Sequence, residues 1–244
     1  MEKFLLLNKS VFFPEEGILA IGDLHLGYEK MLKTSGFEFP INQIKETKQE
    51  LEKIFLEIKK QKFKLKKIVI LGDLKHHFNF EVEEKFEIRK LLSFLEESVS
   101  RENIIILKGN HEKINFREAE YKDYFVEKTV AFTHGDKLFP KILDKKIKTI
   151  VMGHLHPAVL IHDPKSHKKE KYKCFLVGKW KGKTAIVLPS FLQIIEGTDI
   201  RSESARHKDN NFLIIPRKNL LKFKVFIPDK TGKVFEFPKL ERIN

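Results

Sequence analysis

Five short runs of apolar, mostly β-branched residues recur along the first two-thirds of this 244-residue chain, and each leads into a polar cluster. Runs of this kind are expected for strands buried on both faces of a sheet. Ligands bind at the carboxyl ends of strands in open α/β sheets, so we expect the five clusters to converge on one site. In chain order the clusters are Asp23-Leu24-His25, Gly72-Asp73, Gly109-Asn110-His111-Glu112, His134-Gly135-Asp136 and Gly153-His154-Leu155-His156.

Two amphipathic helix patterns lie between these runs. Apolar side chains spaced for one helical face recur from roughly residue 41 to 62 and again from about 81 to 97. Strand alternating with helix predicts βαβ units and an α/β fold with a layered core. The strand-like runs themselves span residues 17–21, 67–71, 103–107, 130–132 and 149–152.

The chain after Pro157 is richer in strand patterns. A hairpin around a glycine-containing turn is predicted for residues 174–188, and the polar stretch 198–211 predicts a loop. No long linker separates the two parts, so we expect a single domain over residues 1–244. Its α/β part, which carries the five polar clusters, would cover 1–160 and a β-rich second sheet 161–244. Further strand-like runs follow at residues 212–215, 221–227 and 234–237.

The residue types at the five strand ends indicate a metal. Imidazoles together with carboxylates suit manganese, iron, zinc or nickel, and the lone cysteine, Cys174, argues against a zinc ribbon. One carboxylate can bridge two cations about 3.5–4 Å apart, as in phosphoryl chemistry. In Asp23-x-His25 and His154-x-His156, we expect both side chains of each pair to point to the same side of an extended backbone. Each residue alone could be an ordinary turn or cap residue, and only the whole set in this order favours a metal site.

In the order D-x-H, G-D, G-N-H-E, H and G-H-x-H, these clusters resemble the calcineurin-like metallophosphoesterases over roughly residues 18 to 160. The stretches 72–76 (GDLKH) and 153–157 (GHLHP) are most similar to prokaryotic ICC-like phosphoesterases, including the type associated with DNA ligase. Those proteins resemble SbcD-type nucleases in turn. By this resemblance the fold is a four-layer α/β/β/α sandwich.

The resemblance also implies two divalent cations, with manganese favoured over iron, zinc or nickel. A hydroxide bridging the cations would attack phosphorus while the cations offset charge on the phosphate oxygens. The implied ligands are Asp23, His25 and His156 for the first cation, Asn110, His134 and His154 for the second, and Asp73 as the bridge.

Two further histidines are candidate catalytic residues. The resemblance makes His111 a histidine that binds no metal and, as imidazolium, stabilises or protonates the departing oxygen. The alternative for His111 is a residue at a helix start that faces solvent. Protein phosphatases of the family have an Asp that orients this histidine, whereas this chain has His76 there. That difference favours the nuclease-like branch and a phosphate contact for His76.

The net positive charge of the chain is compatible with a nucleic-acid substrate but does not establish one. The 47 Lys and Arg against 34 Asp and Glu give a net charge of +13, which attracts polyanions such as DNA or RNA. A lysine-rich surface is equally typical of thermophile proteins. We therefore expect a phosphodiesterase of the nuclease kind. A small-molecule phosphomonoesterase or cyclic-nucleotide phosphodiesterase is the alternative, and a non-catalytic binding scaffold is the least favoured. The oligomeric state is left open.

The sequence predicts neither a membrane span nor a signal peptide. It has no run of about 18 apolar residues. The first residues hold one short apolar run, at 4–7, and no small-residue cleavage site. We therefore expect a cytoplasmic protein.

Overall fold

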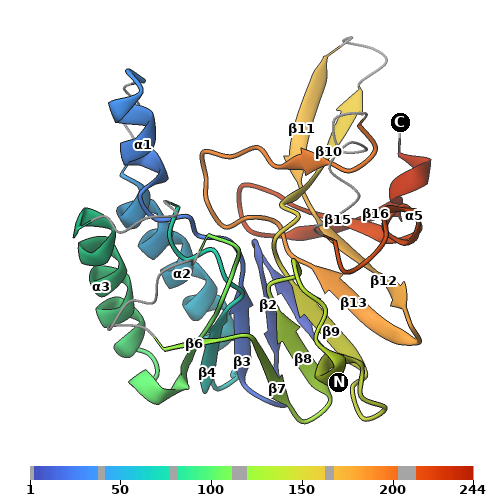
Figure 1. Ribbon diagram of the computed structural model, residues 1–244, viewed down its shortest axis with the longest axis horizontal. Helices are drawn as coiled ribbons and strands as arrows, with labels where there is room; N and C mark the ends of the chain where they lie inside the picture. The colour runs from blue at the N-terminus through green and yellow to red at the C-terminus, as the bar shows by residue number, and fades with distance from the viewer. Residues whose placement is uncertain are drawn as a thin grey trace.

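The apolar runs of the sequence form two mixed sheets that pack face to face at the centre of the molecule (Figure 1). The computed structural model describes residues 3–37, 42–76, 82–111, 120–162, 168–202 and 213–243. Side chains alternate between the two faces of each strand, because successive residues of a strand point to opposite sides. In β4 (Lys67–Ile70), Ile68 and Ile70 face the helices, whereas Val69 faces the other sheet.

Among the described residues, the first sheet has six strands that follow the order of the chain. Strands β3 to β6 are parallel, and β1 and β2 join them as an antiparallel edge. The strands are β1 (Leu5–Leu7), β2 (Ser10–Phe13), β3 (Ile18–Ile21), β4, β5 (Ile104–Leu107) and β6 (Tyr121–Lys122).

Helices cover the outer face of this sheet (Figure 1). Helix α2 (Gln43–Lys60) and helix α3 (Val82–Glu96) lie within two residues of the bounds expected for the two amphipathic patterns. Leu51, Ile54 and Ile58 of α2 are buried against the sheet, as their spacing predicts. A shorter helix, α1 (Tyr28–Thr34), has no buried residue and projects from the body (Figure 1).

The second sheet begins earlier in the chain than residue 161. Strands β8 and β9 belong to it, because β9 pairs in parallel with β8 on one side and with β13 on the other. The hydrophobic pattern of a buried strand is the same in either sheet, so the sequence did not reveal this membership. In spatial order the sheet is β16 (Val234–Lys239), β15 (Lys224–Pro228), β12 (Phe175–Trp180), β13 (Lys183–Val187), β9 (Thr149–Met152), β8 (Val130–Thr133) and β7 (Tyr124–Glu127).

Short elements cover the outer face of the second sheet. They bury residues such as Ile142, Leu220 and Leu240. The α/β class expected from the sequence is confirmed, and its second outer layer is built from helical turns and a small sheet. These elements are η2 (Pro140–Leu143), α5 (Arg217–Leu220), η3 (Leu240–Arg242) and a sheet of β11 (Lys169–Lys173), β10 (Pro157–His162) and β14 (Thr198–Asp199).

Two expectations for the later part of the chain were wrong. The stretch 198–211 is not entirely a loop, because Thr198–Asp199 pair in parallel with β10 as strand β14. The run 212–215 forms no strand over its described residues 213–215. Ile214 and Ile215 are apolar because they are buried in the core, which requires no sheet pairing. Residues 203–212 lie outside the described part. No helix in the described ranges has both the length and the apolar character needed to cross a bilayer.

Candidate metal centre

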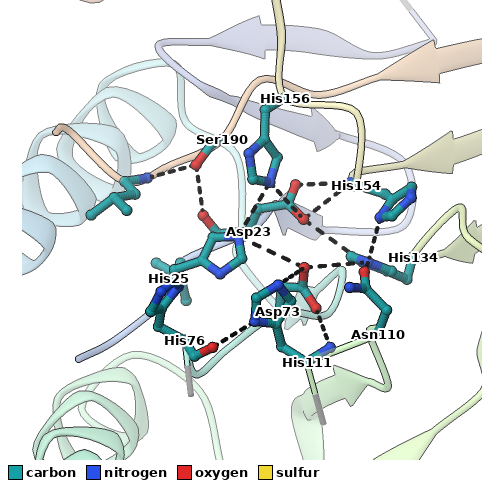
Figure 2. Close-up of polar contacts among 12 residues, drawn as sticks. Asp23, His25, Asp73, His76, Asn110, His111, His134, His154, His156 and Ser190 are labelled. Atoms are coloured by element: carbon teal, nitrogen blue, oxygen red, sulfur yellow. Dashed lines mark hydrogen bonds and ion pairs between the residues drawn. The ribbon is translucent and has the colours of Figure 1, made fainter. Parts of the chain in front are cut away.

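The nine side chains singled out by the sequence lie together where five strands end (Figure 2). Three of these strands belong to the first sheet and two to the second, so the centre lies across the junction of the sheets. Asp23 and His25 follow β3, Asp73 and His76 follow β4, Asn110 and His111 follow β5, His134 follows β8, and His154 and His156 follow β9.

A first group of ligand atoms comes from Asp23, His25, Asp73 and His156, and these atoms all lie within 4.8 Å of one another. The Nε2 atoms of His25 and His156 are 3.3 Å apart. His156 Nε2 lies 3.4 Å from Asp23 Oδ1, and His25 Nε2 lies 3.7 Å from Asp73 Oδ2. Two imidazole nitrogens and two carboxylates therefore face a common point.

A second group comes from Asp73, His134 and His154. His134 Nε2 lies 3.5 Å from Asp73 Oδ2 and 3.1 Å from His154 Nδ1. Asn110 joins this group, since its Oδ1 lies 3.1 Å from His134 Nε2. Asp73 is common to both groups, which is the position that a bridging carboxylate requires.

The hydrogen-bonding roles around His134 fit a metal. Its Nδ1 lies 2.9 Å from the carbonyl oxygen of Leu71, so Nδ1 carries the proton and donates it. Nε2 is then an acceptor, and it faces the Asp73 carboxylate and the Asn110 carbonyl oxygen, which are acceptors too. Converging lone pairs repel one another unless a proton or a metal ion lies among them, so this position suits a cation. A ligating histidine that donates its other ring N–H to a backbone carbonyl is the usual arrangement at metal sites.

Several of the candidate ligands have an unusual backbone conformation, with a positive φ angle. Non-glycine residues with positive φ are uncommon, and they cluster at functional sites where surrounding structure holds them in place. The extended backbone expected for Asp23-x-His25 and His154-x-His156 is therefore wrong, because all four of these residues are left-handed. Five candidate ligands have this conformation: Asp23 (φ 40°), His25 (φ 44°), Asp73 (φ 45°), His154 (φ 68°) and His156 (φ 45°).

Donors from elsewhere in the fold hold the loop after β3. Phe191 N donates to the carbonyl oxygen of Gly22 at 3.1 Å, and Ser190 Oγ donates to that of Asp23 at 2.9 Å. Gln43 Nε2, at the start of α2, donates to the carbonyl oxygens of the next two residues, each at 2.9 Å. Ser190 and Gln43 are buried. Four consecutive carbonyl groups are thus satisfied although the strand has ended.

The Asp23 carboxylate is also fixed directly. The backbone N–H of His154 lies 3.0 Å from both carboxylate oxygens. Gly153 permits this close approach, because a Cβ atom there would lie 2.5 Å from Asp23 Oδ2. Gly72 plays the same part for His134, whose Nδ1 would lie 2.6 Å from an added Cβ. The glycines of the sequence motifs therefore make room for the side chains of neighbouring loops.

His111 and His76 lie on one side of this centre (Figure 2). The backbone N–H of His111 donates to Asp73 Oδ1 at 3.0 Å. Its ring Nδ1 lies 2.5 Å from the carbonyl oxygen of His76, so Nδ1 donates and Nε2 faces the centre, 4.0 Å from Asp73 Oδ2. The His76 ring packs edge-on against Tyr28, with centroids 4.7 Å apart. His111 is thus anchored at the centre and does not simply face solvent.

Burial and the neighbouring charges set the protonation of these groups. Burial lowers the pKa of His154 to about 4 and holds the pKa of His25 well below its ordinary value, so both are neutral, as metal ligands must be. Burial opposes ionisation of Asp23, yet His156 and His134 outweigh burial and lower the pKa of Asp23. For His134 the carboxylates of Asp73 and Asp23 outweigh burial and raise the pKa.

Sequence reasoning missed Ser190 and Gln43. Ser190 carried a usable signal, because it follows the strand-like run 184–188 just as the other clusters follow their runs. Gln43 carried none, since a polar residue in the first turn of a helix is ordinary. Its role depends on where α2 begins relative to the loop after β3.

Comparisons with known proteins identify the family and the fold of the chain. The family model for the calcineurin-like phosphoesterases matches residues 17–177. Among solved structures, nuclease MPE from Pseudomonas putida aligns over 96% of this chain and 94% of its own, with TM-score 0.60 and 16% identity, which shows a shared fold. A Vps29 double mutant from Entamoeba histolytica aligns over 90% and 98% of the two chains, with TM-score 0.37 and 11% identity. No curated protein matches the sequence.

Proposed function

Because the chain belongs to the calcineurin-like phosphoesterases, a family of metal-dependent hydrolases, we propose that it hydrolyses phosphodiester bonds in nucleic acid or nucleotides at a centre of two divalent cations. The observation that carries the dinuclear part is the pair of ligand groups that share Asp73. Manganese is the proposed native metal, because imidazole, carboxylate and amide ligands without thiolates suit it.

The proposed ligands divide as the two groups do. Asp23, His25 and His156 would hold one cation. Asn110, His134 and His154 would hold the other, with Asp73 between them. Bound at these positions, two cations supply an acidified water molecule and positive charge beside a phosphate.

His111 is the proposed general acid. Its Nδ1–H is committed to the carbonyl oxygen of His76, which leaves Nε2 to carry a proton toward the oxygen that leaves phosphorus. The hydrogen bond from its backbone N–H to Asp73 keeps the ring at a fixed distance from the proposed bridge. His76 is proposed to contact a phosphate oxygen from the same side of the centre.

Three observations support a nucleic-acid substrate. The net charge of +13 favours polyanions. The fold is shared with a protein named as a nuclease. By the family resemblance, His76 takes the place of the Asp that protein phosphatases use. We also propose one domain for residues 1–244, supported by the apolar layer that joins the two sheets.

The test begins with metal-free protein that is reloaded with manganese. We expect two manganese ions per chain by elemental analysis, and faster turnover of bis-p-nitrophenyl phosphate than of p-nitrophenyl phosphate. End-labelled single- and double-stranded DNA and RNA, with cyclic nucleotides alongside, should identify the natural class of diester.

Asp73→Asn serves as the blank, and Asp229→Asn, an exposed residue of the β15–β16 turn, is the matched control. A single metal ion per chain would contradict the dinuclear centre. Preference for the monoester would exclude the phosphodiesterase assignment, and cleavage of cyclic nucleotides alone would exclude nucleic acid.

A further inference from the structure

A short loop behind Asp23, residues 189–193, connects the proposed metal centre to a buried cluster of charges. Ser190 is 1% exposed, and its hydroxyl donates to the carbonyl oxygen of Asp23 at 2.9 Å. The next residue, Phe191, donates its N–H to the carbonyl oxygen of Gly22 at 3.1 Å. These two donors of the loop therefore fix the backbone around Asp23, which is left-handed and lies beyond the end of β3.

The backbone carbonyl groups of residues 190–192, in the same loop, face two lysines. Lys173 Nζ donates to the carbonyl oxygen of Ser190 at 3.2 Å and to that of Leu192. Lys9 Nζ donates to the carbonyl oxygen of Phe191 at 3.0 Å. Three consecutive carbonyls are thus bound by two ammonium groups, one from the end of β11 and one from the turn before β2.

The lysines are held in a mostly buried network. Lys9 Nζ lies 2.9 Å from Glu50 Oε2 of α2, and both side chains are less than a tenth exposed. Gln193 also donates to Glu50. Burial lowers the pKa of Lys173 to about 7, with the positive charge of Lys9 adding to the effect. Burying two lysine amino groups here beside one carboxylate costs free energy, which the three carbonyl dipoles offset in part.

We propose that Lys173 and Lys9 are positioning residues for the metal centre, because they fix the loop through which Ser190 holds Asp23. The inference rests on the proposed function. His154 N anchors the carboxylate end of Asp23, and Ser190 anchors the carbonyl group of Asp23 itself, so loss of the Ser190 hydroxyl loosens the backbone that carries the side chain. Outer groups that orient metal ligands typically change metal affinity by about 10- to 100-fold.

The test compares two variants with two matched controls. Ser190→Ala removes the hydroxyl that holds Asp23, and Lys173→Met removes the ammonium group behind it. Thr149→Ala removes the hydroxyl of another buried residue, at the start of β9, which is the end of that strand away from the centre. Lys183→Met removes another buried ammonium group, which donates to the carbonyl oxygens of Asp144 and Ile147 at the opposite end of β13, each at 2.8 Å.

Manganese affinity is measured by calorimetric titration of metal-free protein, and the melting temperature is recorded for each variant. We expect Ser190→Ala and Lys173→Met to weaken manganese binding by about 10-fold or more. The controls should lose stability to a similar extent and keep the affinity of the wild type.

Wild-type affinity in Ser190→Ala would overturn the proposal, even if Lys173→Met failed to fold. An equal loss of affinity in the controls would overturn it too, because general destabilisation would then be the cause. Wild-type protein that bound no manganese and cleaved no diester would overturn the proposed function instead, together with this inference.

Discussion

Individual residues of the centre adopt conformations that they would avoid in an ordinary strand end. Each positive-φ residue costs on the order of 1–3 kcal/mol, and five of the seven proposed ligands have one. The buried donors around the loop after β3 offset part of this cost, since each satisfies a carbonyl group that would otherwise be buried without a partner. Ser190 and Gln43 therefore matter to the centre although neither is a proposed ligand.

His111→Ala is expected to lower turnover of the manganese-loaded enzyme by about 10²-fold and to leave the metal content unchanged. Burial lowers the pKa of His111, so only a minor fraction is imidazolium at neutral pH. This acidic fraction grows as the pH falls. The ratio of wild-type to His111→Ala turnover should therefore rise from about pH 8 to about pH 6.

That ratio is obtained from steady-state kinetics on a diester at saturating manganese. A ratio that stays constant across this range, or that falls toward acid, would contradict the role of His111 as a proton donor. The metal content of both proteins is checked at each pH, so that loss of metal is not mistaken for loss of the acid.

Gly153→Ala should weaken metal binding by at least tenfold, because the new Cβ would lie 2.5 Å from Asp23 Oδ2 and displace the carboxylate. Gly22→Ala is the matched control. It also lies directly after a strand beside the centre, but its Cβ would make only ordinary contacts, the nearest at 3.5 Å. Manganese titration of both variants makes the comparison. Equal affinities in the two would show that the tight space at Gly153 is not needed.

At the scale of elements, the sequence locates the buried strands well and the exposed ones poorly. Strands β3, β4, β5, β8 and β9 lie within one residue of their predicted bounds, because dense β-branched runs have few other uses in a globular protein. Strand β11 is exposed along most of its length, so it has no hydrophobic signal, and only its pairing with β10 defines it. Helix α1 buries no residue and was missed for the same reason.

Which loops meet could be predicted, but not how they are held. The structure brings the nine candidate residues together as expected, since the position of a polar cluster after a buried strand is a local property. Gln43 acts on the loop after β3 from α2, and Ser190 acts on it from the loop after β13. Such contacts depend on the docking of elements far apart in the sequence.

Packing of the segment after α5 against β12 gives a prediction for stability. A Cβ on Gly178 would lie 2.2 Å from Cδ1 of the buried Phe223 ring. Gly178→Ala should therefore lower the free energy of unfolding by about 1–3 kcal/mol through overpacking. Urea denaturation measures the effect.

The double variant Gly178→Ala/Phe223→Leu tests the cause. Leucine at 223 gives the new methyl group room, so the double variant should be more stable than the two single losses added together. If the losses in free energy of unfolding of the two single variants simply add, the destabilisation by Gly178→Ala would come from the backbone of β12 and not from contact with Phe223.

For the whole molecule, we expect the proposed centre to add stability only when cations are bound. Ligands that bind the folded state alone stabilise it by about 2.7 kcal/mol at a hundredfold excess over the dissociation constant. Removing metal with a chelator should lower the melting temperature of the wild type, and added manganese should restore it. Asp73→Asn should show a much smaller change, whereas Asp229→Asn should behave like the wild type. Melting temperatures are measured by circular dichroism. An equal change in Asp73→Asn and in the wild type would contradict this expectation.

The division of the proposed ligands between two sheets has a consequence for assembly. Asp23, His25, Asp73 and Asn110 follow strands of one sheet, and His134, His154 and His156 follow strands of the other. Neither half by itself offers a complete coordination shell for either cation. If these residues are the ligands, we expect a partly synthesised or partly unfolded chain to bind metal weakly, and the ions to bind only after the two sheets have packed together.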